Sequence, residues 1–570
     1  MAIFEAAVLA LMALVVTPGW LFYFDVIPKV ALVLAGAAVL LLGSRRFEWR
    51  GWFPALLLLS ALWLALSTAF SRNPALSMYG TSWRKFGLVT QVSVFLFAFL
   101  SGRNQKTTLR GITIASAIAA LYGIAQYAGW DPLLPASAYH IGEGVWTIVR
   151  PPGTLGYATY FANWLSMAAF LAVVLARMEE RPAWRRFASA AAALCAAATI
   201  LTGTRAGILA LLCGAVFLAW GRIAVSRAVV AAAIVIAGFT AFYFSPAGWP
   251  LRSRTRWFIE DPWGGARMML WRDSLHMAAS RLAVGNGPEV FTAAFPAYES
   301  KQLAETYPDF SLESPHNIFL DALVSQGVMG LLLLGALCYF GFRYGDRRFL
   351  PALAAAIVAH QFSVFIAPTA LLFFTTLALS AQRTWEPEPS RFFVLARAAA
   401  AFALVFVAVH IVVADRALVL TSRSLIAGDL TAAMQHYRDY QRWRLPGSAA
   451  DLWYSRSLAA MTSNLPNPLM RARAFAEAID AGERATRTAE DPFNAWYSLS
   501  ALRAVTNDAA GVESSLERAI AARPNWFKPH WALARLLYLE NRGPEARVEA
   551  ALALELNHGH DPEVTRSLQK

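Results

Sequence analysis

The chain has 570 residues; 57% are hydrophobic, only 15% are charged, and 50 Lys and Arg stand against 37 Asp and Glu. Soluble globular proteins carry about 25% charged residues, so this composition excludes an ordinary soluble multidomain protein. Residues 1–413 hold 31 basic and 19 acidic residues and so carry +12 of the total net charge of +13. Their charged residues lie between hydrophobic runs. A nucleic-acid-binding protein would gather its basic residues on one surface, so no nucleic-acid partner is expected.

Thirteen apolar runs in the first 413 residues are long enough, or nearly so, to cross a membrane, which takes about 20 apolar residues. They lie at 3–24, 29–43, 52–70, 86–101, 109–129, 153–176, 187–203, 206–220, 228–245, 317–341, 349–366, 368–381 and 392–413. The number of membrane helices is therefore about 12–13, because the pair of runs around Pro368 forms either a hairpin or one broken helix. Residues 3–24 lack the basic start of a signal peptide and predict the first membrane segment. The three cysteines, Cys195, Cys213 and Cys338, lie inside these runs and are expected to be core residues.

Basic residues occupy every second connection between these runs. They are Arg45, Arg46 and Arg50; Arg103, Lys106 and Arg110; Arg177, Arg181, Arg185 and Arg186; Arg222 and Arg227; Arg343, Arg347 and Arg348; and Arg383 and Arg391. Short loops rich in Lys and Arg stay in the cytoplasm. The pattern predicts a cytoplasmic amino terminus, with segments 71–85, 130–152 and 203–205, the long loop 246–316 and the tail outside.

The tail, residues 416–570, predicts paired helices. Trp496 and Trp531 are 35 positions apart, and Pro492 and Pro524 are 32 apart. This period is typical of tetratricopeptide repeats, whose stacked helix pairs offer a concave surface for a protein partner. The alternative is a spacer or a stabilising cap on the membrane part. The expected fold is all-α: a polytopic helical membrane domain, 1–415, followed by a soluble helical repeat domain, 416–570.

The motifs of soluble enzymes that we examined are absent, including the phosphate loop, HExxH, GxSxG and paired CxxC. Polar residues instead gather at the predicted outer ends of the membrane runs. In "SLESPHNIFLDALVSQG", Ser314 and Pro315 predict the start of a helix that has His316 in its first turn. A helix amino terminus disfavours the imidazolium, so a neutral His316 is suited to accept a proton from a hydroxyl. The alternative is a histidine that caps backbone groups at the membrane surface.

Three arginines lie on the same predicted side. Arg205 stands in a tight turn, where anchoring at the membrane surface is the alternative role; Arg150 precedes Tyr157, Tyr160 and Asn163; and Arg267 opens an amphipathic stretch with Trp271 and Arg272. Guanidinium groups match phosphate oxygens in pairs, so these arginines and His316 form a set suited to anion binding and proton transfer. No metal and no cofactor is expected.

The segments "RPPGTLGYATYFAN", "LTGTRAGILALL", "RMMLWRDSLHMAASRLAVGNGPEVFTAAFPAY" and "ESPHNIFLDALVSQGVMGLLLL" resemble the O-antigen ligase family over about residues 52–380. This family includes lipid-linked polysaccharide polymerases and protein O-oligosaccharyltransferases. Two positions differ from the family pattern. Thr204 replaces a common Ser, and Tyr157-Ala158-Thr159 replaces an Asn-Pro-Asn run, which weakens the use of Arg150.

The resemblance implies a GT-C-like, inverting and metal-independent glycosyltransferase of the bacterial inner membrane, acting on the periplasmic face. Its donor would be a glycan on undecaprenyl diphosphate, and its acceptor a hydroxyl of lipid A core, a lipid-linked glycan or a protein. It implies that His316 activates or orients the hydroxyl, and that Arg205 and Arg267 hold the diphosphate. Arg150, Tyr157, Asn163, Arg272, Glu313 and Asn317 are the further candidate substrate-binding residues.

Two other classes remain open at this stage. A transporter or lipid flippase would carry polar residues through the depth of the bilayer, and only His360 and Gln361 stand near mid-span. A membrane scaffold for the tail would leave His316 and the arginines without a role. Glu299, Glu305, Asp309 and Glu313 precede His316 in the long loop; a glycosidase pair among them would need a defined separation across the sugar, which one sequence does not give. Glu313 is expected to be a solvated loop charge, and the alternative is that it orients His316.

Overall fold

The computed structural model describes the chain except for residues 45, 48–49, 103, 142–147, 221–236, 261–264, 382–385, 388–390 and 569–570. Several predicted features lie outside the described residues: Arg45, Arg103, Arg222, Arg227, Arg383 and the first half of the run 228–245.

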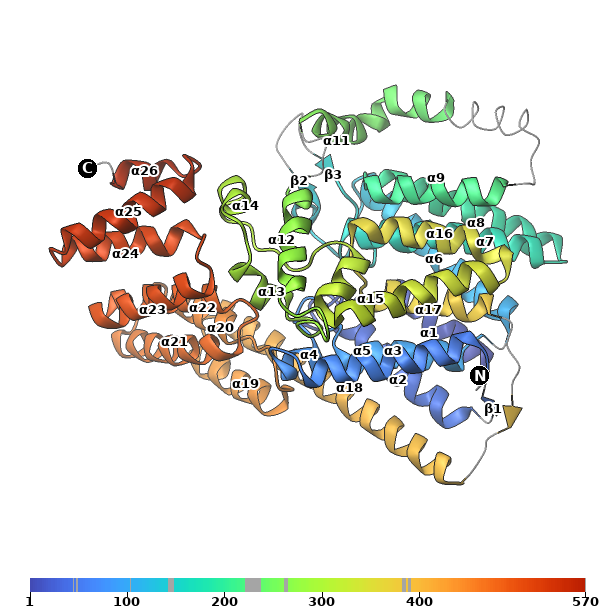
Figure 1. Cartoon of the computed structure of the whole chain (residues 1–570), viewed down its shortest axis with the longest axis horizontal. Coiled ribbons are helices and arrows are strands. Elements are labelled where there is room, and N and C mark those ends of the chain that lie inside the picture. Colours follow the sequence, from blue (N-terminus) through green and yellow to red (C-terminus); the bar gives the residue numbers. More distant parts are fainter. Residues whose placement is uncertain are drawn as a thin grey trace.

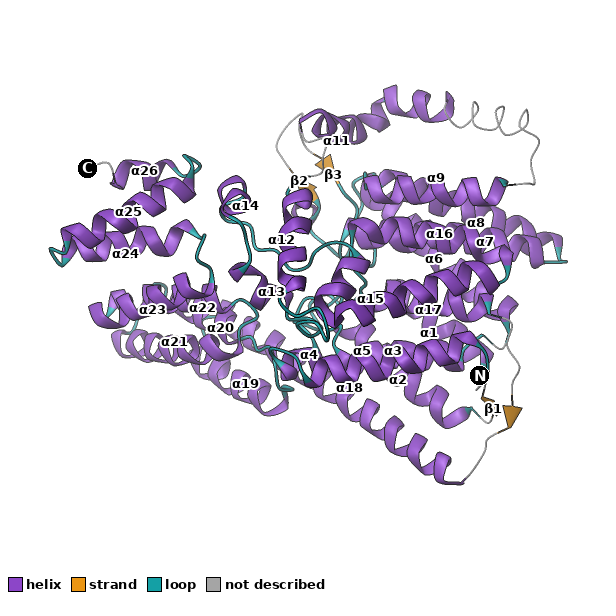
Figure 2. Cartoon of the chain, viewed as in Figure 1, coloured by secondary structure: helices purple, strands orange, loops and turns teal. Residues whose placement is uncertain are grey.

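The protein is all-α, with a helical bundle at one end and a helical tail at the other (Figures 1 and 2). The bundle helices are α1 (Ala2–Leu14), α2 (Ile27–Gly43), α3 (Trp52–Ala69), α5 (Leu88–Leu100), α6 (Gln105–Tyr127), α7 (Ala158–Met178), α8 (Pro182–Leu201), α9 (Arg205–Ala219), α15 (Ile318–Tyr344), α16 (Leu350–Ala359), α17 (Ala367–Ser380) and α18 (Arg391–Ile426). The tail helices are α19 (Leu430–Trp443), α20 (Asp451–Thr462), α21 (Pro468–Thr488), α22 (Pro492–Val505), α23 (Ala509–Ala522), α24 (Phe527–Leu539), α25 (Gly543–Asn557) and α26 (Pro562–Leu568).

Shorter elements connect these helices, most of them in the long loop before α15. They are α4 (Pro74–Tyr79), η1 (Ala136–Ala138), η3 (Pro246–Gly248), α11 (Trp249–Glu260), α12 (Arg267–Ala279), α13 (Phe291–Ala294), η4 (Phe295–Ala297), α14 (Lys301–Thr306), η5 (Arg347–Phe349) and η6 (His360–Phe362). Strands among the described residues form two short antiparallel pairs, β1 (Arg46–Phe47) with β4 (Glu386–Pro387) and β2 (His140–Ile141) with β3 (Ile148–Val149). Arg46 pairs with Pro387, and His140 pairs with Val149.

The bundle has the character of a membrane domain. Within the described residues, α3, α6, α7, α15 and Val394–Ile426 of α18 are long and apolar enough to cross a membrane, and α1, α2, α5, α9 and α17 are shorter apolar helices. Large apolar side chains such as Leu62 and Phe402 are exposed on its outside, as a lipid-facing surface requires, while Trp164 and Phe373 are fully buried inside. The predicted polytopic, all-α fold is therefore confirmed.

Helix boundaries differ from the predicted runs at two places. The first helix ends at Leu14 rather than near residue 24, because Pro18 and Gly19 turn the chain. The last helix, α18, continues through residue 415 to Ile426, so the expected domain boundary at 415/416 falls inside a helix. Near that boundary, the Asp415 carboxylate accepts the N–H of Phe22 at 2.6 Å, which ties the turn after α1 to α18.

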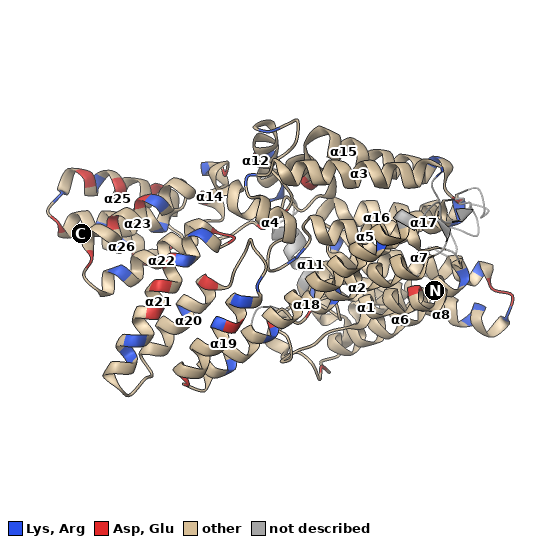
Figure 3. Cartoon of the chain, turned by 90° about the horizontal axis from the view of Figure 1, so that it is seen from below, with Lys and Arg blue, Asp and Glu red and all other residues tan. Residues whose placement is uncertain are grey.

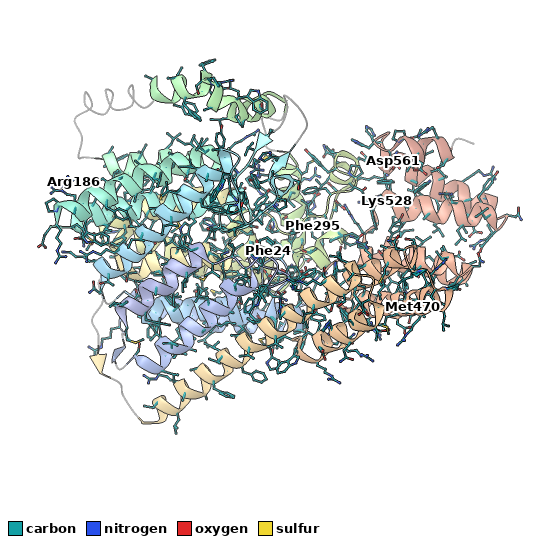
Figure 4. The ribbon with its side chains drawn as sticks, turned by 180° about the vertical axis from the view of Figure 1, so that it is seen from behind. Phe24, Arg186, Phe295, Met470, Lys528 and Asp561 are labelled. Carbon is teal, nitrogen blue, oxygen red and sulfur yellow. The ribbon has the colours of Figure 1, made fainter. Side chains whose placement is uncertain are left out.

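The predicted cytoplasmic connections that can be traced gather at the end of the bundle opposite the tail. Arg186 marks this end in Figure 4, and in Figure 3 charged residues are coloured at the bundle ends and over the tail, with few along the middle of the bundle. Ion pairs link these connections, including Arg110 to Glu179 at 2.6 Å. The arrangement has the two-sided charge distribution that the sequence predicts.

The long loop is fastened to α15 at a break in that helix. Gly327 has a φ of 68°, a left-handed conformation open to glycine, and an added Cβ would lie 2.4 Å from the carbonyl oxygen of Leu282. The loop supplies the hydrogen bonds that the break leaves open: Val328 N–H donates to Leu282 O at 2.9 Å, and Gly287 N–H donates to Ser325 O at 2.9 Å. The loop therefore sits on α15 through its backbone.

In the tail, each helix from α19 to α26 follows its predecessor closely in space (Figure 1), with α20 packed on α21, α22 on α23 and α24 on α25. Its core includes the stacked rings of Tyr437 and Tyr454, whose centroids are 3.7 Å apart. The tail also contacts the long loop, where Arg523 forms a buried ion pair with Glu299 at 2.7 Å. The assignment to tetratricopeptide repeats stays a prediction.

Candidate functional site

His316 lies directly before α15, at the end of the bundle that faces the tail. Asn317 is the N-cap of this helix, because its side-chain oxygen accepts the N–H groups of Phe319 and Leu320 at 2.9 and 3.1 Å. The predicted helix start at Ser314 and Pro315 is therefore wrong. An Asn side chain caps backbone N–H groups well, so the N-cap follows His316 and the helix begins two residues after it. His316 itself adopts a left-handed φ of 50°.

The surroundings of His316 keep its ring neutral. Burial of this half-buried side chain, together with the nearby guanidinium groups of Arg267 and Arg84, lowers its pKa from 6.5 to about 4. The Ser314 hydroxyl lies 3.3 Å from Nδ1. The sequence attributed a neutral histidine to the helix dipole; the structure attributes it to burial and two arginines.

Arg267 reaches His316 because α12 packs on α15. The indole N–H of Trp271, one turn after Arg267, donates to the carbonyl of Pro315 at 2.9 Å, which holds α12 against the residue before His316. The Arg267 guanidinium lies 6.0 Å from the centre of the Phe362 ring, and Trp271 packs against the same ring at 6.3 Å. Phe362 belongs to η6, so this short helix supports the arginine beside His316.

Arg205 lies on α9, and Arg150 lies between β3 and the neighbouring helix α7. Arg205 is the first residue of α9, and the hydroxyl of the preceding Thr204 is 3.5 Å from the carbonyl of Ala158 at the start of α7. Arg150 stacks on Tyr157, with its guanidinium carbon 5.7 Å from the ring centre. Since α9 and α15 both contact η6, the helix start that carries Arg205 is linked to the His316 region through η6.

The remaining predicted residues have less direct positions. Asn317 is used as a helix cap, and its amide nitrogen donates to the Gln361 side chain at 3.1 Å. Asn163 is fully buried within α7. The Arg272 guanidinium donates hydrogen bonds to Asp273, Ser300 and Gln302, at 2.6 to 3.0 Å. Glu313 is exposed, yet the protein around it raises the pKa of its carboxyl, and Glu490 of the tail adds to that rise.

The sequence analysis did not identify Arg84, a buried arginine whose charge acts on His316. Arg84 is buried and pairs with Glu289, and its NH1 lies 3.4 Å from Asp321 of α15. Burial alone would lower the pKa of Arg84, but the carboxylates of Glu289 and Asp321 raise it above its usual value. Glu289 also accepts the N–H and hydroxyl of Thr81 at 3.0 and 2.7 Å. The sequence did contain an indication: Arg84 and Lys85 are basic residues in a connection predicted to lie outside, whereas basic residues usually concentrate in cytoplasmic connections.

Two acidic residues of the long loop form ion pairs with the tail. Glu299 pairs with Arg523, and Asp309 pairs with Lys528 at 2.6 Å and accepts the indole N–H of Trp526 at 3.3 Å. Burial raises the pKa of Glu299, and Arg523 opposes that rise. Both partners are in the tail, more than 200 residues away in the chain, so the sequence gives no local sign of these pairs.

The two polar residues near mid-span serve the packing. His360 is buried with Nδ1 2.7 Å from the carbonyl of Ala356, and the Gln361 amide accepts from Asn317. Among the residues that the structure describes, no group of three or more His, Cys, Asp or Glu side chains is arranged to hold a metal ion.

Residues 190–335 match a family model described as O-Antigen ligase. The matched segment includes Arg205, Arg267, Glu289 and His316. It begins after Arg84 and Arg150 in the chain and ends before the tail. No curated protein matches the chain. The match supports a membrane glycosyltransferase of the O-antigen ligase and polymerase family, which uses a lipid-linked glycan donor and an acceptor.

Proposed function

We propose that this protein transfers a glycan from undecaprenyl diphosphate to an acceptor hydroxyl, in the manner of an O-antigen ligase, at the end of the bundle that faces the tail. The membrane would be the bacterial inner membrane, with that end and the tail in the periplasm. The observation that carries the proposal is the neutral His316 beside Arg267, at the start of a membrane helix. A base and an anion-binding group lie together where a lipid-anchored diphosphate can reach them.

In the proposed reaction, His316 accepts the proton of the acceptor hydroxyl at Nε2. This requires the tautomer whose Nδ1–H donates to the Ser314 hydroxyl, which lies 3.3 Å away. The acceptor oxygen then forms a bond to the anomeric carbon of the donor sugar as the bond from that carbon to the diphosphate oxygen breaks. Attack from the side opposite the diphosphate inverts the anomeric carbon.

The leaving group is undecaprenyl diphosphate, which carries away the bonding electrons as negative charge. Arg267 and Arg205 would stabilise that charge, Arg267 from beside His316 and Arg205 from the first turn of α9. Arg150, stacked on Tyr157, would extend the arginine-lined path on the α7 side. Arginine suits this role because its planar fork donates two hydrogen bonds to one phosphate.

The test uses purified protein and a labelled undecaprenyl-diphosphate oligosaccharide, with no acceptor, with lipid A core, or with a pilin-type peptide. A single product that requires lipid A core supports the ligase. A product ladder without added acceptor would replace it with a polymerase, and a product that requires the peptide would replace it with a protein glycosyltransferase.

Three variants and one control test the roles of the residues. His316→Ala should abolish transfer, whereas His276→Ala, an exposed histidine on α12, should transfer normally. Arg267→Lys and Arg205→Lys should weaken donor binding, because a lysine cannot form the paired contact. Normal transfer by His316→Ala would refute the proposed base. Absence of both donor binding and transfer by the wild-type protein would favour transport.

A further inference from the structure

A groove runs between the tail and the bundle. On the tail side it is lined by Trp453, Arg456 and Ala460 of α20 and by Glu490 and Asp491 of the α21–α22 turn; Tyr23 lines it on the bundle side. Its volume is about 420 Å³, within the ~300–1,000 Å³ of sites that bind small ligands. Phe24, labelled in Figure 4, marks this junction of bundle and tail.

The groove is built by contacts between the two parts of the chain. Phe22 packs edge-on against Trp453, with ring centres 4.8 Å apart, and the Glu490 carboxylate accepts the N–H of Ser82. Asn494 donates to Asp491 at 2.6 Å, which fixes the second carboxylate. Its walls are thus held in place before any ligand arrives.

The groove extends toward the His316 loop. Burial raises the pKa of the Glu490 and Asp491 carboxyls, and both groups act on Glu313 by raising its pKa. Charges influence one another in this way only over short distances. The Glu490 carboxylate also accepts the N–H of Ser82, two positions before the Arg84 of the candidate site. The acidic edge of the groove therefore borders that site.

The lining favours a sugar over other ligands. An aromatic ring packs against the C–H face of a pyranose, and carboxylates accept hydrogen bonds from its hydroxyl groups. The carboxylates would repel a phosphate group. The tail side of the groove is formed by helix α20 and the α21–α22 turn, so it offers no strand edge to an extended peptide.

We infer that this groove binds the acceptor glycan, holding unphosphorylated sugar residues on Trp453 and Asp491 so that the reacting hydroxyl points toward His316. This inference rests on the proposed function, because it gives the acceptor its place. It also gives the tail a direct part in substrate choice.

The experiment measures binding and transfer separately. The probe for binding is a dephosphorylated lipopolysaccharide core oligosaccharide, added to the full-length protein in detergent without donor, and compared with the phosphorylated core oligosaccharide and with a Ser/Thr-rich peptide. The wild-type protein should bind the dephosphorylated glycan best. Trp453→Ala and Asp491→Asn should each weaken that binding about tenfold, the size expected for loss of one ring contact or one charged hydrogen bond.

The matched control is Trp496→Ala, which removes a tail tryptophan that packs on Arg518 outside the groove, and it should bind as the wild type does. Thermal unfolding of each variant shows that a loss of binding is not a loss of folding. In transfer assays, Trp453→Ala should raise the acceptor KM while kcat at saturating acceptor stays near normal.

Three results would overturn the inference: no glycan binding by the wild-type protein, equal glycan binding by Trp453→Ala and Trp496→Ala, or preference for the peptide. These are distinct from failure of the proposed function. If glycan binds through Trp453 but no donor glycan is ever transferred, the groove stands and the proposed reaction fails. If transfer proceeds and Trp453→Ala binds and transfers normally, only the groove assignment fails.

Discussion

Two buried ion pairs of the same composition hold the long loop, and they do different work. Glu289 pairs with Arg84 of the bundle, whereas Glu299, further along the same loop, pairs with Arg523 of the tail. Both carboxylates and both guanidinium groups are almost fully buried. The first pair lies within electrostatic reach of His316, and the second has no such effect on it.

The difference shows that residue type and burial do not define a role; position does. Arg84 has a second carboxylate partner, Asp321, and its charge helps to keep His316 neutral. Arg523 donates its hydrogen bonds to the loop, including one to the carbonyl of Phe310 at 3.2 Å, and its guanidinium lies over the Phe493 ring of the tail. We therefore regard the Arg84 pair as part of the site and the Arg523 pair as the fastening between tail and loop.

The largest effect is expected when the Arg84 pair is broken. Glu289→Gln should lower the free energy of unfolding by about 3–5 kcal/mol, because it leaves a buried guanidinium without its main partner. Thermal unfolding in detergent measures this. Glu180→Gln, which breaks the exposed contact with Lys106, is the control and should change stability by less than about 1 kcal/mol. Equal effects of the two variants would contradict the view that Glu289 is essential to the bundle.

The Arg523 pair should be replaceable, which sharpens the contrast. Arg523→Met alone should cost about 3 kcal/mol and expose the loop before His316 to protease, since it leaves Glu299 buried and unpaired. The double variant Arg523→Met, Glu299→Leu should recover most of that stability, because an apolar pair can fill a buried site. A double variant as unstable as the single one would show that the pair does more than fasten.

The pH dependence of transfer distinguishes the charges around His316 from the Arg523 pair. The transfer rate should be flat near neutral pH and fall as the pH approaches the His316 pKa of about 4, where the ring takes up a proton. Because this pKa lies below the ordinary 6.5, the stability that His316 contributes is complete above about pH 6.5 and declines as the pH falls toward 4. Removing the positive charge with Arg267→Gln should move the acid limb to higher pH. Arg523→Met should leave the limb where it is, and a shift in that variant would break the comparison.

The smallest effect is expected at a third contact between tail and loop. Lys301 pairs with Glu555 at 2.5 Å, but both side chains are about half exposed. Lys301→Ala should therefore change the free energy of unfolding by no more than about 1 kcal/mol, and less at high salt. Unfolding measured at low and high salt checks this, and a loss as large as that of Arg523→Met would be inconsistent with it.

Local patterns predicted much of the fold. Apolar runs such as 52–70 and 317–341 became α3 and α15 with ends shifted by a few residues, because hydrophobicity over about 20 residues is a property of the segment itself. The exact start of α15 was misplaced, since the choice between Ser314 and Asn317 as cap depends on packing around His316.

The candidate site was predictable only in part. His316, Arg267 and Arg205 were chosen from their positions at helix ends, and the structure places Arg267 beside His316. The roles of Arg84 and of the loop acids Glu299 and Asp309 were missed, because they depend on partners such as Arg523 that are distant in the chain. A single sequence carries no local signal of such pairing.

The Arg523–Glu299 pair also determines when, during synthesis of the chain, the loop before His316 can be fully assembled. Glu299 leaves the ribosome 224 residues before Arg523 exists. Until the tail is made, the loop that leads to His316 has a buried carboxylate with no cation to meet it. A chain cut short before Arg523 would contain His316 and every candidate arginine, yet its loop would lack this ion pair with the tail. The protein thus couples maturation of its reactive end to completion of its own synthesis.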